Sequence, residues 1–427
     1  MRPTFIDLFS GAGGMSLGFE QAGFEPVAAV EIDPIHAAAH KFNFPNCETL
    51  ARSVTDVTGD ELLALPGLKG RAPDVVIGGA PCQGFSLIGK RALDDPRNSL
   101  VRDFVRIVRD TKARFFVFEN VKGLTVGNHR AFLDEIVSEF QSIGYQVRLD
   151  WKVLNAKDHG APQNRQRLIL MGARAGETLP KYPTPHQDSP TCADALDDLP
   201  NAEEFDALLS SDSVETWKWG SPDNAYAREM RCLSNDAWHF GHVRQWTPEI
   251  LTASARTNHT DISRRRFAET EEGSVEPISR FFKLPSAGVS NTLRAGTDSA
   301  RGAFTSPRPI HFRHARCVTV REMARLHGFP DWFRFHTTKW HGARQIGNAV
   351  PPPLARAVAL KVMEASGNKA QRSDQTQSLG DPSLLEMTMA QAASHFGVSV
   401  LIGRRDRKSG AKKRTQLEIE AERTAAE

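Results

Sequence analysis

Short apolar runs alternate with segments of helical spacing along the first part of the chain. Five runs predict buried β-strands, at residues 4–9, 27–30, 74–77, 115–118 and 168–171. Residues 15–22, between the first two runs, have the apolar spacing of a helix. Strands that alternate with helices predict an α/β fold with a doubly wound, mostly parallel sheet. Ligands and catalytic groups collect at the carboxyl edge of such a sheet, so residues that follow a strand are the first candidates for a site.

A glycine-rich turn, Ser10 to Gly14, joins the first strand to the predicted helix. Glycines at a helix N-terminus allow a ligand to approach the backbone closely. The second strand ends at Glu31, the position at which a carboxylate holds ribose hydroxyls in nucleotide-binding folds. The glycines do not match G-x-G-x-x-G, so the turn predicts a nucleotide-type site without supporting a nicotinamide or flavin cofactor.

A single thiol follows the third strand, in the sequence Pro81-Cys82-Gln83. A cysteine at this edge of the sheet is a nucleophile if its surroundings favour the thiolate. Taken alone, a lone cysteine is more often a small buried hydrophobe. Glu119 follows the fourth strand and is either an exposed loop carboxylate or a general acid or base.

Two arginines precede the fifth strand. Because side chains alternate along a strand with a period of two, Arg165 and Arg167 are expected to lie on one face. They form either a solvated edge or a pair of guanidinium groups that reaches a phosphate or a base oxygen.

Composition limits the class of protein. A chain of 427 residues with 40% hydrophobic content predicts two or three domains, and a net charge of +3 is weak evidence for an anionic partner. The five cysteines are widely spaced and include no C-x-x-C pair, which disfavours structural zinc and a disulfide framework. The chain shows no leader and no apolar run near the ~18 residues of a membrane span. We therefore expect a cytoplasmic protein without a membrane partner.

Six segments, in order, resemble the sequence motifs of the cytosine-C5 DNA methyltransferases: residues 7–14, 79–86, 118–121, 163–167, 319–331 and 345–351. They extend over residues 4–172 and 309–364, about half of the chain. The resemblance implies the fold of S-adenosylmethionine-dependent methyltransferases, double-stranded DNA as substrate, and no metal. It also implies that the target cytosine is rotated out of the duplex.

The resemblance assigns roles to residues of this sequence. Cys82 adds to C6 of the flipped cytosine, Glu119 hydrogen-bonds the ring at N3, and Arg165 and Arg167 bind the base carbonyl and backbone. C5 then takes the methyl group of S-adenosylmethionine. Ile32 stands where some members have an aromatic residue, and Asp56 is the candidate for an acidic residue that contacts the adenine. The full set of implied cofactor-binding residues is Phe9, Ser10, Gly11, Gly13, Gly14, Glu31, Ile32, Asp56, Pro81 and Asn348.

The resemblance divides the chain into four parts. Residues 1–172 and 309–366 form one discontinuous catalytic domain, and residues 173–308 form a smaller target-recognition domain. Its tryptophans are core residues more often than base contacts, and Arg264, Arg265 and Arg266 form either a solvated face or phosphate contacts. Residues 367–427 are a linker, a helix that could open a helix-turn-helix, and a basic tail with seven positive charges between residues 404 and 414. A chain that ends near Ala365 is then expected to keep its methylation specificity and most of its turnover.

Three functions compete. The first is a DNA cytosine-5 methyltransferase of bacterial type that methylates a specific duplex sequence, with a restriction endonuclease as a possible partner that acts on the same site without direct contact. The second is a related methyltransferase that acts on cytosine in tRNA, which the long middle insertion disfavours. The third is a DNA-binding regulator that has lost the chemistry. The presence of Cys82, Glu119, Arg165 and Arg167 together disfavours that regulator.

Overall fold

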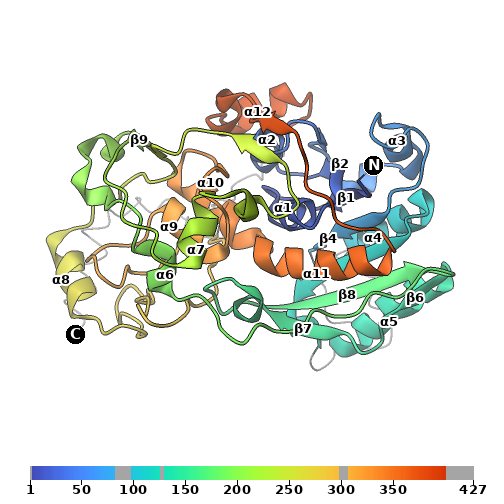
Figure 1. Ribbon diagram of the computed structural model, residues 1–427, viewed down its shortest axis with the longest axis horizontal. Helices are drawn as coiled ribbons and strands as arrows, with labels where there is room; N and C mark the ends of the chain where they lie inside the picture. Colours follow the sequence, from blue (N-terminus) through green and yellow to red (C-terminus); the bar gives the residue numbers. More distant parts are fainter. Residues whose placement is uncertain (1, 82–97, 126–128, 298–305, 401–427) are drawn as a thin grey trace, which may run out of the picture.

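The computed structural model describes residues 2–81, 98–125, 129–297 and 306–400, and Figure 1 shows their arrangement. An eight-stranded sheet has the strand order β3-β2-β1-β4-β5-β8-β6, and β7 pairs with β8. The strands are β1 (Thr4–Leu8), β2 (Glu25–Val30), β3 (Glu48–Leu50), β4 (Val75–Gly78), β5 (Phe115–Val121), β6 (Tyr145–Val147), β7 (Lys152–Asn155) and β8 (Gln166–Arg174).

The first five strands of the sheet are parallel, whereas β8 runs antiparallel to β5, β6 and β7. Alternate residues of the central strands enter two different apolar cores. Phe5 and Val75 belong to a core that includes helices α1 (Gly14–Gln21) and α11 (Pro352–Ala365). Ile6 and Val76 belong to a second core, with α4 (Ser99–Thr111) and α5 (His129–Ser142). The predicted α/β fold with a doubly wound, mostly parallel sheet is confirmed.

Strand boundaries differ from the sequence-based ones at three functional positions. β1 ends at Leu8 because Phe9 has a φ of 62°, a left-handed conformation that ends the strand. β5 continues to Val121, so Glu119 lies near the end of that strand rather than in a loop. β8 begins at Gln166, which leaves Arg165 outside the strand and Arg167 within it.

The end of the catalytic part returns to the first part of the chain. Helix α9 (Val320–His327) is followed by α10 (Lys339–Asn348) and then by α11, which packs against α1. The two helices approach so closely that a side chain at Gly18 would overlap Ala355. The sequence-distant motifs around residues 10 and 348 are therefore brought together by direct helix packing.

The inserted region between β8 and α9 is made of short elements: α6 (Cys192–Leu196), β9 (Val214–Glu215), α7 (Ala225–Met230), β10 (Val243–Gln245), β11 (Ile250–Leu251) and α8 (Asp261–Glu269). Trp238 is buried and stacks on Trp332 at a centroid distance of 5.9 Å, whereas Trp217 is 76% exposed. Two buried ion pairs join the region to the rest of the chain. Arg325 of α9 contacts Asp198 at 3.0 Å, and Arg244 of β10 contacts Glu20 of α1 at 2.7 Å.

Residues 376–396, which include part of the predicted linker and the helix predicted after it, are packed against the fold. β12 (Thr376–Ser378) pairs in parallel with β10. Residues 382–385 and α12 (Met389–His395) then pack on α2 (Pro34–Asn43), as Figure 1 shows, because Leu384 and Leu385 cover the apolar face of α2. The second helix of a helix-turn-helix and the basic tail would lie beyond residue 400, outside the described residues.

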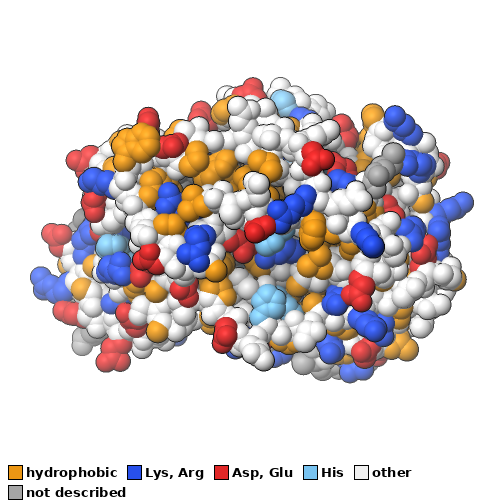
Figure 2. Space-filling model, in the orientation of Figure 1, with side chains coloured by type: hydrophobic (Ala, Val, Ile, Leu, Met, Phe, Trp, Pro, Cys, Tyr) orange, Lys and Arg blue, Asp and Glu red, His pale blue; other side chains and the backbone are white. Residues whose placement is uncertain are grey.

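Figure 2 shows acidic and basic side chains interspersed over the face that carries α11, without a large field of one sign. None of the helices in the described part of the chain is long and apolar enough to cross a bilayer.

Candidate active site

A cavity of about 410 Å³ opens at the carboxyl ends of β1, β2, β4 and β5, where the strand order reverses. This is the edge at which α/β folds bind ligands, and the volume is in the range of small-molecule sites. Eight of the ten predicted cofactor-binding residues line the cavity: Phe9, Ser10, Gly11, Gly14, Glu31, Ile32, Pro81 and Asn348.

The glycine-rich turn and Glu31 hold each other in place. The backbone N–H of Gly11 donates to Oε2 of Glu31 at 2.8 Å, and that of Asp33 donates to Oε1 at 2.8 Å. Burial raises the pKa of Glu31 above its ordinary value. Ser10 has a buried hydroxyl that finds no hydrogen-bond partner among the described residues. Since buried polar atoms are normally paired, this hydroxyl is available to a ligand in the cavity.

Ile32 gives the cavity an apolar wall, because its side chain is 50% exposed beside Glu31. Apolar contact and nearby ribose-binding groups fit the adenosine part of S-adenosylmethionine. Among the described residues, no cluster of three or more His, Cys, Asp or Glu side chains could hold a metal ion.

Two of the predicted cofactor residues lie elsewhere. Asp56 is exposed at the end of the short helix Val54–Asp56, and the neighbouring Ser53 and Val54 line the cavity instead. Gly13 has a φ of 103° and does not line the cavity, and a side chain at this position would overlap the ring of Phe44. Its role is to allow the left-handed turn that starts α1.

The polar end of the cavity is formed by Glu119. Nε of Arg167 lies 2.8 Å from Oε1 of Glu119, and both side chains are largely buried. A side chain at Gly79 would lie 2.5 Å from Oε2 of Glu119, so the glycine lets the carboxyl group lie across the end of β4. Asn120 donates from Nδ2 to the carbonyl of Ala80 at 3.0 Å and so holds the backbone two residues before Cys82. Cys82 itself lies outside the described residues.

Neither arginine lines the cavity: Arg167 contacts Glu119, and Arg165 has other partners. Its buried guanidinium donates to the carbonyls of Leu293, Gly347 and Ala349, at distances of 2.8–3.0 Å. Arg165 precedes β8, and its guanidinium is committed to these backbone carbonyls, whereas that of Arg167 contacts Glu119. Arg165 instead holds the backbone on both sides of Asn348.

Several cavity residues were not expected from the sequence: Asp7, Met15, Val30, Asp33, His36, Arg52, Ser53, Val54, Gly79, Leu100, Arg344, Ala349 and Val350. Asp7, Gly79, Ala349 and Val350 belong to three of the six motif segments, which assign them no role of their own. The remaining residues flank the expected ones or reach the cavity through tertiary packing.

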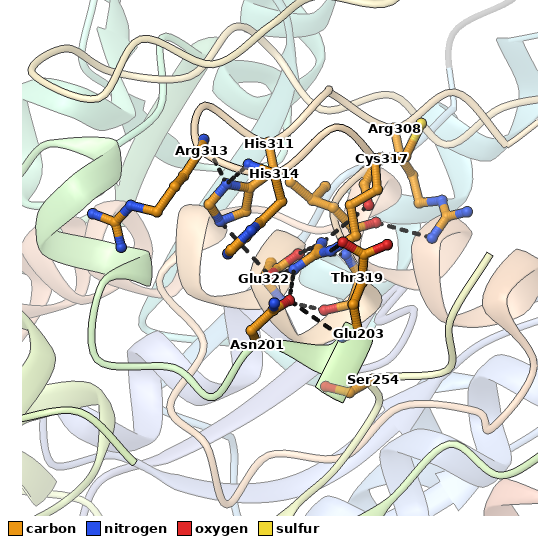
Figure 3. Close-up of polar contacts among 12 residues, drawn as sticks. Asn201, Glu203, Ser254, Arg308, His311, Arg313, His314, Cys317, Thr319 and Glu322 are labelled. Atoms are coloured by element: carbon orange, nitrogen blue, oxygen red, sulfur yellow. Dashed lines mark hydrogen bonds and ion pairs between the residues drawn. The ribbon is translucent and has the colours of Figure 1, made fainter. Parts of the chain in front are cut away.

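A polar cluster outside the cavity joins the inserted region to α9 (Figure 3). Arg316 donates to both oxygens of Glu322, at 2.8 and 2.7 Å, and Glu322 also accepts from the backbone of Thr319. The ring of His311 accepts two backbone N–H groups, and burial lowers its pKa to about 3, so it is neutral. This cluster fixes the start of α9.

The arginine run in α8 is partly committed to internal ion pairs. Arg264 contacts Glu203 at 2.6 Å, and Arg266 contacts Glu276 at 3.4 Å. Arg265 is exposed. Of the three, Arg265 is the residue whose surroundings leave it most accessible to a phosphate.

Comparison with known proteins agrees with this site. The sequence model of the family described as C-5 cytosine-specific DNA methylase matches residues 3–364. The Type II methyltransferase M.XorII of Xanthomonas oryzae pv. oryzae is 59% identical over 407 residues, which cover 95% of each chain. The Type II methyltransferase M1.HphI of Haemophilus parahaemolyticus is 36% identical over 376 residues, covering 86% of this chain and 89% of the relative.

A crystal structure of a prophage-encoded putative DNA modification methyltransferase from E. coli has a TM-score of 0.71 and 31% sequence identity, and the similarity covers 86% of this chain and all of that one. The glycine turn, Glu31, Glu119 and Asn348 meet in one cavity of such a fold. The chain thus belongs to the C-5 cytosine-specific DNA methylase family, and it is a DNA cytosine-5-methyltransferase whose methyl donor is S-adenosylmethionine.

Proposed function

We propose that the protein methylates C5 of a cytosine within one specific sequence of duplex DNA, with Cys82 as nucleophile, as the modification enzyme of a bacterial Type II restriction system. The observation that carries the proposal is the position of the Glu119–Arg167 pair. Glu119 lines the same cavity as Glu31, Asn348 and Pro81, the residue before Cys82, and Arg167 contacts the carboxyl group of Glu119 from outside that lining.

The chemistry requires the target base to leave the helix, which costs a few kcal/mol of unpairing and unstacking. The thiolate of Cys82 then adds to C6 of the pyrimidine, which turns C5 into an enamine carbon. Glu119 donates a hydrogen bond or a proton to N3, so negative charge does not accumulate on the ring during the attack. When bound, S-adenosylmethionine supplies an electrophilic methyl group at C5. Loss of the C5 proton then expels Cys82.

The surroundings of Glu119 suit this role. Arg167 orients the carboxyl group from one side, while the missing side chain of Gly79 leaves the other side open. Arg167 is then also placed to contact the carbonyl of the flipped base. We assign Arg165 to positioning, because it holds the backbone next to Asn348 and has no access to the cavity.

The cofactor is held by the glycine turn and its neighbours. Phe9 and Ile32 pack on the adenine, Glu31 binds the ribose hydroxyls, and the hydroxyl of Ser10 and the side chain of Asn348 supply polar contacts. Residues 173–308 read the bases of the target, in a duplex that lies between this region and the catalytic cavity.

Bisulfite sequencing of DNA from cells that express the protein tests the proposal directly. We expect the cytosine at one position of one recurring sequence to resist conversion by bisulfite. This protection should depend on an intact Cys82. The same DNA should resist cleavage by an endonuclease that cuts that sequence. Methylation of tRNA without methylation of duplex DNA would contradict the proposed substrate.

A further inference from the structure

A carboxyl group faces the cofactor cavity from inside the sheet. Asp7 lies in β1, is 1% exposed, and lines the cavity together with Gly11 and Glu31. Its Oδ2 accepts a hydrogen bond from the hydroxyl of Ser16 at 2.5 Å. The hydroxyl of Ser16 bonds Oδ2 and not Oδ1, and the backbone of Ser16 also interacts with this carboxyl group. Ser16 thus holds the carboxyl group at the wall of the cavity.

Behind Asp7 runs a chain of hydrogen bonds through three buried residues, Ser16, His40 and Thr49. Oγ of Ser16 lies 3.1 Å from Nε2 of His40, and Nδ1 of His40 lies 3.4 Å from the hydroxyl of Thr49. Burial lowers the pKa of His40 to about 3, so its ring is neutral and carries one N–H. Since Ser16 donates to Asp7, it accepts from Nε2–H, and Nδ1 accepts from Thr49. The whole chain thus directs its donors toward the ionised form of Asp7.

Asp7 has no ion-pair partner among the described residues: Arg52, which also lines the cavity, pairs with Glu61, and neither Arg344 nor His36 of the same lining pairs with Asp7. Across the cavity, Glu31 is another carboxylate, and behind Asp7 the His40 ring is neutral. Burial raises the pKa of the nearby Cys47 thiol, so this group is neutral as well. None of the ion pairs among the described residues includes Asp7. Burial, with a further contribution from Glu31, raises the pKa of Asp7 to about 7.

We propose that Asp7 is a specificity-determining carboxylate that distinguishes the methyl donor from its demethylated product, with Ser16 and His40 as positioning residues. S-adenosylmethionine and S-adenosylhomocysteine share every other group, but only the donor carries a sulfonium cation. A buried anion without a counter-ion gains most from the ligand that brings the missing charge. The inference rests on the proposed placement of the cofactor in this cavity.

The sign of the pH dependence follows from the raised pKa of Asp7. Below pH 7 the free protein carries a proton on Asp7 that the sulfonium must displace, and above pH 7 it does not. Affinity for the donor therefore rises with pH and levels off, and at pH 6 it is about tenfold below its plateau. Affinity for the product should change less than about threefold over the same range.

Isothermal titration calorimetry with the full chain, without DNA, at pH 6, 7 and 8 tests this inference. The two ligands are S-adenosylmethionine and S-adenosylhomocysteine. For the wild type, the ratio of product Kd to donor Kd should rise about tenfold from pH 6 to pH 8. Asp7→Asn keeps the shape and an acceptor for Ser16 but removes the charge, so its ratio should be flat and its donor affinity at least tenfold lower. Glu48→Gln, an exposed carboxylate of β3, is the matched control and should behave like the wild type.

Ser16→Ala separates positioning from structural support. Without the Ser16 donor, ionised Asp7 is less stable, so the pH at which donor affinity reaches half of its plateau should move upward while the plateau remains. Conservative Ser16→Thr should restore the wild-type midpoint.

Three results would overturn the inference: a wild-type ratio that is flat with pH, an Asp7→Asn protein that loses both ligands equally, or an unmoved midpoint in Ser16→Ala. If Asp7→Asn does not fold, the wild-type and Ser16→Ala profiles still decide. Failure of the wild type to bind either ligand would instead contradict the proposed cofactor site.

Discussion

Residues 376–396 provide the sharpest test of the packing, because the sequence predicts that a chain ending at Ala365 remains functional. In the structure such a chain loses Leu384 and Leu385, both buried against Phe42 and the alanines of α2. Full burial of a leucine stabilises a fold by about 1.5–3 kcal/mol, so the two contribute about 3–6 kcal/mol together. The truncation also removes β12 from β10 and the backbone bond from Gly380 to Phe42.

We therefore expect the chain that ends at Ala365 to unfold at a lower temperature, by roughly 4–8 °C, and to expose the apolar face of α2. Thermal unfolding followed by circular dichroism measures the shift. A chain that ends at Val400 is the control, since it keeps every packed residue of this segment. Equal melting temperatures for the chain ending at Ala365 and the control would show that the packing on α2 contributes nothing, and the reasoning would fail.

Three further predictions concern the chemistry and the target. Cys82→Ser should abolish methyl transfer in a tritium-incorporation assay, and the variant should still bind DNA normally. Only the wild type should form a covalent adduct with DNA that contains 5-fluorocytosine. An active serine variant would exclude Cys82 as nucleophile. Glu119→Gln should lower turnover by about 10²–10⁴-fold with little change in cofactor Kd, whereas wild-type turnover would remove Glu119 from the reaction. A hybrid that carries a relative's counterpart of residues 180–300 should methylate the relative's target sequence, as measured by bisulfite sequencing. It should fold only if partners for Glu20 and Arg325 are retained. A folded hybrid that still methylates the original sequence would refute the recognition role.

The sequence predicts well those features that depend on local order. Glu31, Pro81 and Glu119 each follow or end a short apolar run, and parallel strands bring such positions to one edge of the sheet. The glycine turn is predicted for the same reason. These positions depend on residues that are neighbours in the sequence, so the sequence alone is enough to predict them.

The sequence predicts poorly those features that depend on contacts across the fold. Arg165 looks like a second anion-binding arginine, but carbonyls from Leu293 and Gly347, more than a hundred residues away, draw it inward. The resemblance makes Asp56 the candidate for an adenine contact, yet Asp56 lies exposed at the end of the short helix Val54–Asp56. The polar residues 376–378 have no strand pattern, yet they form β12 by pairing with β10. Each of these outcomes is set by partners that no local pattern indicates.

The paired charges of Arg244 and Glu20 restrict how this enzyme can change over generations. Both side chains are buried, and the guanidinium also lies 4.9 Å from the ring centroid of Trp332. Loss of either partner alone leaves a bare charge in the interior and costs about 3–5 kcal/mol, while replacement of both by apolar residues can be neutral. A single substitution at either position therefore gives an unstable protein. Arg244 and Glu20 have to change together, whereas exposed residues of the inserted region, such as Trp217, can change one at a time.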